Sequence, residues 1–240
     1  MPPRTSRAAT YNLAVHPNDT AGRFRDLTID QFASRLASSD PVPGGGSASA
    51  IAAALGASLV TMVASLTTGR PKYVDHEPML ALATETGRRL SEQFLVLADE
   101  DAEAYAGYSV ALKMPRETEA EIASRTQAMR SAARGASEAP FRCLEACLDL
   151  VGAAEALAGR SNPNAASDVD VAALLGEAAA RGAAANVLIN LPSTGDPEFE
   201  GAMTARVTEL LSAIDDVASR AHQVVASGER REPLEPVGQA

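Results

Sequence analysis

Aromatic residues are scarce in this 240-residue sequence: they make up 4% of it, and tryptophan is absent. Proteins that stack nucleic-acid bases depend on exposed aromatic side chains. Basic residues are also in deficit, with 21 lysines and arginines against 31 acidic residues and a net charge of −10. An acidic surface repels phosphate backbones. We therefore expect no nucleic-acid partner, no sugar-binding groove and no aromatic-rich β-sandwich.

Residues that form disulfides or bind metals are equally few. The two cysteines, Cys143 and Cys147, are four residues apart, which suits one helix face but neither a redox pair nor half of a zinc site. The three histidines are far apart in the sequence and lack ligand spacing. We predict no metal site and a location in the reducing cytoplasm.

The two ends of the chain have the composition of unstructured segments. Residues 1–26 are charged and turn-forming without the apolar core of a secretory signal, and residues 229–240 are polar and proline-rich. We predict a flexible N-terminal leader at 1–26, a helical domain at 27–228 and a flexible C-terminal tail at 229–240.

One stretch, residues 41–69, contains no charged residue and is long enough to cross a bilayer. Most of its residues are alanine, serine, glycine or threonine, which gain little from lipid. The composition favours a helix that is buried on all sides within a helical protein, so we expect no membrane partner.

Apolar residues recur at steps of three and four along most of the chain, and no alternating strand pattern is present. The sequence therefore predicts an all-α fold, a bundle of long helices, the fourth of which is interrupted near Pro140. The near-heptad seam of the last helix and several glycine- and alanine-rich faces would be exposed in a monomer, so we predict a homodimer. The expected helices cover residues 28–38, 47–67, 78–112, 117–158, 167–190 and 197–226.

Two features near the middle of the chain have the composition of a reactive site. Three glycines, Gly44–Gly46, join a proline-rich turn to a helix; they leave backbone N–H groups free for an anion, or simply form a tight turn. Asp101 falls on the apolar stripe between Leu97 and Tyr105, where burial would raise its pKa and suit general acid–base chemistry. The alternative is a structural carboxylate. Asp99 lies about 200° round the helix from Asp101 and faces elsewhere.

A polar loop and the helix that follows it form the third candidate. Asn164 or Ser167 could cap this helix, with Asp168 in its first turn, and Asn186 and Asn190 lie on one of its faces. Because 18 residues of helix span about 27 Å, Asp168 and Asn186 cannot meet at one small reacting centre within one chain. Either they serve separate purposes, or a long ligand or a second subunit is involved.

A positive site follows the long uncharged stretch. Arg70 and Lys72 form the clearest local cluster of positive charge in this acidic chain. They suit an anionic group, or they only complement the dipole of the preceding helix.

Five segments together resemble the cyclodeaminase/cyclohydrolase family of folate enzymes: PVPGGGSASA, MVASLTTGRPKY, ADEDAEAYAGYSVALKMPRETEAE, SNPNAASDVDVAA and NVLINL. The resemblance runs in order from about residue 28 to 221. It implies an all-helical homodimer that binds a tetrahydrofolate derivative, with or without a polyglutamate tail, and that needs no metal or redox cofactor beyond this substrate.

The resemblance also implies roles for particular residues. Asp101, Asp99 and Asp168 are the candidate catalytic residues, with Asp101 favoured as the general base. The candidate substrate-binding residues are Gly44, Gly45, Gly46 and Ser47 in the glycine motif, Arg70 and Lys72 for a glutamate tail, and Asn162, Asn164, Ser167, Asn186 and Asn190 in the two asparagine motifs.

Two activities occur in the family that the sequence resembles. One interconverts 5,10-methenyl- and 10-formyltetrahydrofolate through water, and the other closes 5-formiminotetrahydrofolate to the methenyl form with release of ammonia. The sequence contains no region that resembles a formiminotransferase, so we favour the cyclohydrolase over the cyclodeaminase. A catalytically silent helical dimer that binds folate or a protein partner is the alternative outside enzymes.

Overall fold

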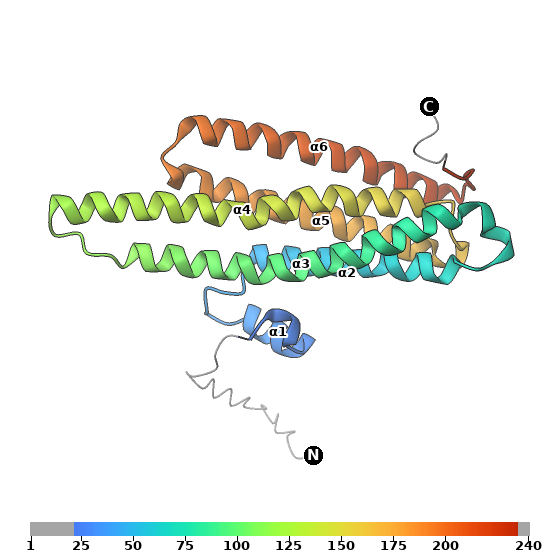
Figure 1. Ribbon diagram of the computed structural model, residues 1–240, viewed down its shortest axis with the longest axis horizontal. Coiled ribbons are helices and arrows are strands. Elements are labelled where there is room, and N and C mark those ends of the chain that lie inside the picture. The colour runs from blue at the N-terminus through green and yellow to red at the C-terminus, as the bar shows by residue number, and fades with distance from the viewer. Residues whose placement is uncertain (1–21, 235–240) are drawn as a thin grey trace, which may run out of the picture.

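The computed structural model describes residues 22–234, and this part of the chain contains helices and no strands (Figure 1). The prediction of an all-α fold is therefore confirmed. Short 3₁₀ turns and loops connect the main helices, which are α1 (Ile29–Leu36), α2 (Gly45–Thr67), α3 (Glu77–Leu112), α4 (Glu119–Leu157), α5 (Ala166–Asn190) and α6 (Pro197–Ser227).

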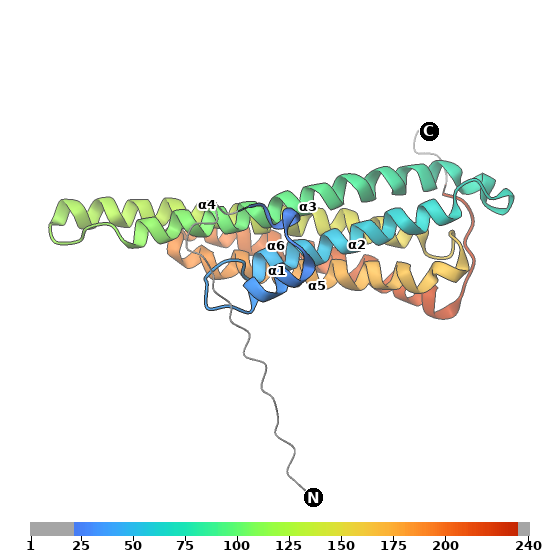
Figure 2. The same cartoon turned by 90° about the horizontal axis from the view of Figure 1, so that it is seen from below.

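The five long helices pack along one another as a bundle (Figures 1 and 2). Helix α2 packs against α3 and α5, and α4 contacts α3, α5 and α6. Small residues allow close approach: a Cβ on Gly87 of α3 would lie 2.7 Å from the carbonyl oxygen of Ala57 on α2. The loop end of the α3–α4 hairpin extends beyond the other helices.

The predicted interruption near Pro140 is wrong, because α4 runs through this residue without a break. Proline lacks an N–H group and removes one hydrogen bond from the helix. Pro140 is buried, and α4 packs against all four other long helices, α2, α3, α5 and α6. Tertiary packing therefore holds the helix together where local propensity would end it.

Parts of both predicted flexible ends lie against the bundle. In the leader, the backbone N–H of Phe24 donates to Asp99 on α3 at 2.7 Å, and the Phe24 ring is buried. In the tail, the N–H of Arg231 donates to the carbonyl of Gly159 at 3.1 Å, and Arg160 donates to the carbonyl of Glu232 at 2.7 Å. Residues 22–26 and 229–234 thus lie against the bundle, because long-range hydrogen bonds that composition does not reveal hold them. The rest of both segments, 1–21 and 235–240, lies outside the described residues.

Helix α2 is not buried on all sides, contrary to expectation. Leu55, Met62 and Leu66 are 56%, 38% and 44% exposed. These residues follow each other at steps of seven and four and therefore share one face. By length and hydropathy alone, α2 and the segment Pro163–Thr194 could each cross a membrane, although about half of each window is buried in the bundle. The absence of a membrane partner stays a prediction.

Candidate active site

The start of α2 and the middle of α3 meet at the centre of the site. Gly44 is the N-cap of α2 and provides no side-chain cap, so the first backbone N–H groups of the helix lack the usual partner. Asp101 of α3 lies against this end. The hydroxyl oxygen of Ser47, which is fully buried, is 3.0 Å from Oδ2 of Asp101 and 3.0 Å from the carbonyl oxygen of Ala98.

Glycine at position 46 permits this contact. A Cβ on Gly46 would lie 2.6 Å from Cγ of Asp101, closer than any real side chain approaches. Backbone conformation does not require glycine here, since none of Gly44, Gly45 and Gly46 has a positive φ. The need is for space: the absent side chain leaves room for the carboxyl group against the helix start.

The environment of Asp101 makes its carboxylate more basic than that of an exposed aspartate. Burial raises the pKa of Asp101, and the hydrogen bonds from the hydroxyl and backbone of Ser47 oppose this rise without cancelling it. A carboxylate with a raised pKa is a stronger base than an ordinary aspartate, and its protonated form can return the proton. Asp101 therefore has the character of a general acid–base residue.

The acidic neighbours of Asp101 face other elements. Asp99 accepts the hydrogen bond from Phe24, and Glu100 pairs with Arg142 of α4. Of these three consecutive acidic residues, only Asp101 points at the start of α2. The structure thus separates Asp99 from Asp101, as their helical angle predicts.

The end of α5 brings two amides towards the same region. A Cβ on Gly45 would lie 3.5 Å from Nδ2 of Asn186, so this side chain is adjacent to the glycine run. Asn186 donates to the carbonyl of Gly182 at 2.8 Å. Asn190 donates to the carbonyl of Ala136 on α4 at 3.0 Å and so links α5 to α4. The predicted glycine motif, Asp101 and Asn186 therefore form one cluster, with Asn190 one turn further along α5.

Tyr105 is a residue that motif analysis missed. It lies one turn beyond Asp101 on α3 and is 42% exposed. Residues four apart share a helix face, so its ring lies on the side of α3 that carries Asp101. The sequence feature that could have indicated Tyr105 is the apolar stripe of α3. This stripe continues into Tyr105, an exposed aromatic residue in a chain that has few aromatic residues.

The remaining predicted residues lie at the opposite end of α2 and α5. They are Arg70, Lys72, Asn162, Asn164, Ser167 and Asp168. The N–H of Asn162 donates to Thr67 at the end of α2. Ser47 and Thr67 are 20 residues apart, so the two groups are separated by about 30 Å along the helix. The structure does not bring them together within one chain.

Capping at the start of α5 differs from the prediction. Asn162 accepts the N–H of Asn164 at 3.2 Å and caps the 3₁₀ turn Pro163–Ala165, after which Ala165 is the N-cap of α5 without a side-chain bond. Neither Asn164 nor Ser167 caps the helix, because the chain enters α5 through the short 3₁₀ turn and the capping side chain, Asn162, lies before that turn.

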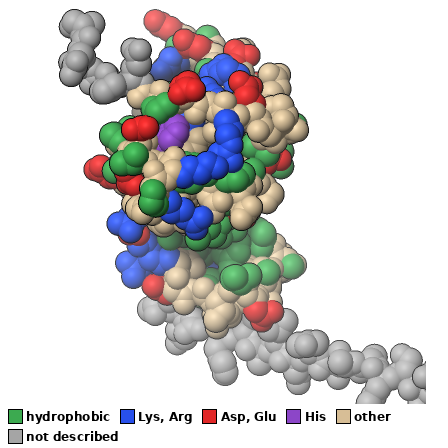
Figure 3. Space-filling view, turned by 90° about the vertical axis from the view of Figure 1, so that its right-hand side faces the viewer, with side chains coloured by type: hydrophobic (Ala, Val, Ile, Leu, Met, Phe, Trp, Pro, Cys, Tyr) green, Lys and Arg blue, Asp and Glu red, His purple; other side chains and the backbone are tan. Residues whose placement is uncertain are grey.

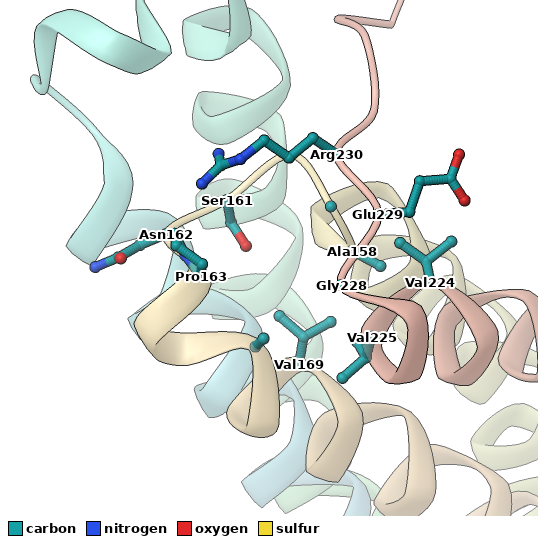
Figure 4. A pocket seen from close by; sticks show the side chains of 12 residues that line it. Ala158, Ser161, Asn162, Pro163, Val169, Val224, Val225, Gly228, Glu229 and Arg230 are labelled. Carbon is teal, nitrogen blue, oxygen red and sulfur yellow. The ribbon is translucent and has the colours of Figure 1, made fainter.

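A small crevice lies beside this second group, between the start of α5 and the end of α6 (Figure 4). Ser161, Val169, Val225 and Arg230 are among the residues that line it. Figure 3 views this end of the bundle and shows lysine and arginine side chains on it, with acidic side chains among them. This end therefore offers exposed basic groups, whereas the Asp101 cluster offers a buried acid.

Known proteins are similar to this chain in sequence and in fold. Residues 28–209 match the sequence family described as formiminotransferase-cyclodeaminase. The chain is 35% identical over 200 residues to a methenyltetrahydrofolate cyclohydrolase of Methylorubrum extorquens, across 83% of this chain and 96% of that protein. It is 33% identical over 206 residues to a formimidoyltransferase-cyclodeaminase of Rattus norvegicus, of which it spans 38%. A formiminotetrahydrofolate cyclodeaminase structure from Thermotoga maritima has a TM-score of 0.77 at 28% identity, covering 85% of this chain and 98% of that one.

Proposed function

The chain belongs to the formiminotransferase-cyclodeaminase family, and from this premise we propose that it is a methenyltetrahydrofolate cyclohydrolase. The observation that carries the proposal is the similarity to a cyclohydrolase along almost the whole of that protein. The buried acid at the start of α2 supports it, because hydration of a methenyl group requires a base that can take a proton from water.

The proposed chemistry begins at the methenyl carbon, which carries positive charge shared between two nitrogens. Asp101 takes a proton from a water molecule while the water oxygen bonds to this carbon, and a neutral carbinolamine results. Asp101 then returns the proton to N5 as the bond between N5 and the carbon breaks. The hydroxyl proton leaves to solvent and the formyl group remains on N10. The carboxylate also stabilises the cationic substrate in a site of low dielectric.

The second candidate is formiminotetrahydrofolate cyclodeaminase. It is favoured by the similarity to the rat protein and to the Thermotoga structure, whose names include this activity. In that reaction Asp101 would give a proton to the departing ammonia as the ring closes. The same residues serve both reactions, so only the substrate distinguishes them.

An assay of the purified full chain on both folates tests the proposal. We expect the methenyl absorbance to fall when 5,10-methenyltetrahydrofolate is supplied, faster than the uncatalysed rate. With the variant Asp101→Asn, turnover should drop by about 10²-fold or more. A rise in methenyl absorbance with 5-formiminotetrahydrofolate, and no effect on the first substrate, would instead establish the cyclodeaminase. Full activity in the Asn variant would remove Asp101 from either mechanism.

The chemistry also bears on what the enzyme requires and where it works. Hydration and cleavage of a C–N bond change no oxidation state, so we propose that no redox cofactor takes part. We also propose that no metal takes part, so that treatment with a chelator leaves turnover unchanged.

The two cysteines are free and buried in α4. Free thiols suit the cytoplasm, which is where we place the protein.

A further inference from the structure

Ser47 has no access to a substrate, and Gly46 before it in the motif is also buried. The exposed fraction of Ser47 is 0%, and its side chain lies between two elements of the bundle. The hydroxyl oxygen is 3.0 Å from Oδ2 of Asp101 and 3.0 Å from the carbonyl oxygen of Ala98, one turn earlier on α3. The role of a substrate ligand, expected from the family motif, does not fit these contacts.

The hydroxyl group has only one hydrogen for these two oxygens. When Asp101 is ionised, Ser47 can donate this hydrogen to the carboxylate. When Asp101 carries a proton, the carboxyl O–H can donate to the Ser47 oxygen, and Ser47 can donate to Ala98. One short rotation of the hydroxyl hydrogen therefore keeps Asp101 hydrogen-bonded in both states.

We propose that Ser47 is a positioning residue that redirects its single hydrogen between Ala98 and Asp101 each time Asp101 gains or loses a proton. The carboxyl group then keeps one orientation throughout the reaction, and no side chain has to move. This inference rests on the proposed function for its catalytic meaning. The contact between Ser47 and Asp101 is observed in the structure and does not depend on the proposed function.

Neighbouring charges do not compete with Ser47 for control of Asp101. On α3, Asp99 accepts a hydrogen bond from the Phe24 amide, and Glu100 pairs with Arg142 of α4. The first turn of α2 contains no charged side chain, and α5 contributes the neutral amide of Asn186. Burial raises the pKa of Asp101, and the opposing effects both come from Ser47. Removing the hydroxyl should therefore move the titration of Asp101 upwards.

The test is a titration that does not depend on turnover. The full chain is labelled with ¹³C at the aspartate carboxyl carbons, and the Asp101→Asn variant identifies the Asp101 resonance. In Ser47→Ala we expect Asp101 to titrate about one pH unit higher than in the wild type, a tenfold change in its ionisation constant. If that variant does not fold, Ser47→Cys keeps a weaker donor in place and should give a smaller rise. The acid limb of the kcat/KM profile should move by the same amount.

Ser49→Ala is the matched control. Ser49 lies two residues further along α2, and its hydroxyl donates only to the carbonyl of Gly45, at 2.7 Å. We expect no change in the titration of Asp101. An unchanged titration in the Ser47 variants, or an equal shift in Ser49→Ala, would overturn the proposal. Absence of cyclohydrolase activity in the wild type would count against the proposed function, while the NMR titration would still decide the role of Ser47.

Discussion

At the scale of single residues, Asp101 depends on what surrounds it on α2. The carboxyl group contacts the hydroxyl of Ser47, and the missing side chain of Gly46 makes room for it. The sequence indicated Asp101 from its place on an apolar stripe of the helix. The helical angle between the two residues also predicted that Asp99 faces elsewhere. The pairing with Ser47 could not be derived in this way, because it joins residues 54 positions apart.

Adding one methyl group to the glycine run should disable the site. In Gly46→Ala, the new Cβ would meet the Asp101 carboxyl group and push it away from the helix start. We expect turnover to fall by about 10²-fold, comparable to loss of a general base. Gly44→Ala is the control, since its Cβ would meet only the Pro41 carbonyl at 3.7 Å. Equal losses in both variants would show that the glycine run acts by some means other than the carboxyl contact.

At the scale of elements, a histidine joins α6 to α5. Nδ1 of His222 is 2.6 Å from Asp170 and Nε2 is 2.8 Å from Glu177. Both ring nitrogens can donate only when the imidazole is charged. Burial lowers the pKa of His222, but the hydrogen bonds and charges of Glu177 and Asp170 outweigh it and leave the pKa raised. The charged form is therefore the one that stabilises the contact between the helices.

This contact should make stability depend on pH. Because the folded pKa lies above the unfolded value of about 6.5, the stabilisation is complete below pH 6.5 and is lost as the pH rises through the folded pKa. Urea denaturation of wild type and His222→Gln should therefore show a difference that shrinks with rising pH, at most about 1 kcal/mol for a partly exposed group. Gln223→Ala, next to His222 on α6, should show no such trend. A difference that stays constant from pH 6 to 9 would contradict this account.

At the scale of the whole molecule, the two groups of candidate residues lie at opposite ends of α2. Figure 2 shows α2 and α5 side by side, and both helices expose apolar side chains, among them Leu55 at 56% and Leu174 at 50%. A two-fold axis across the middle of this face would place the start of one α2 beside the end of the other. We propose that two chains pair in this way, so that each site combines Asp101 of one chain with Asp168 of its partner.

Mixing inactive variants tests this pairing. Asp101→Asn and Asp168→Asn are nearly isosteric, and each should be inactive alone. In a mixed dimer one of the two sites would contain both native aspartates, so co-expression should restore about a quarter of wild-type turnover. Asp101→Asn mixed with Gly46→Ala is the control and should recover nothing, because both changes affect the same end. No recovery in the first mixture, or a monomeric mass by light scattering, would reject the shared site.

The sequence by itself determined the helices, since periodicity and turn residues act locally, and it placed Asp101 on a buried stripe. It also carried enough ordered motifs to indicate the family. Only the tertiary structure decided that Pro140 stays inside a helix, that residues 229–234 lie against the bundle, and that Ser47 reaches Asp101 whereas Asn162 does not. These outcomes depend on contacts between residues distant along the chain, where packing and long-range hydrogen bonds outweigh local preference.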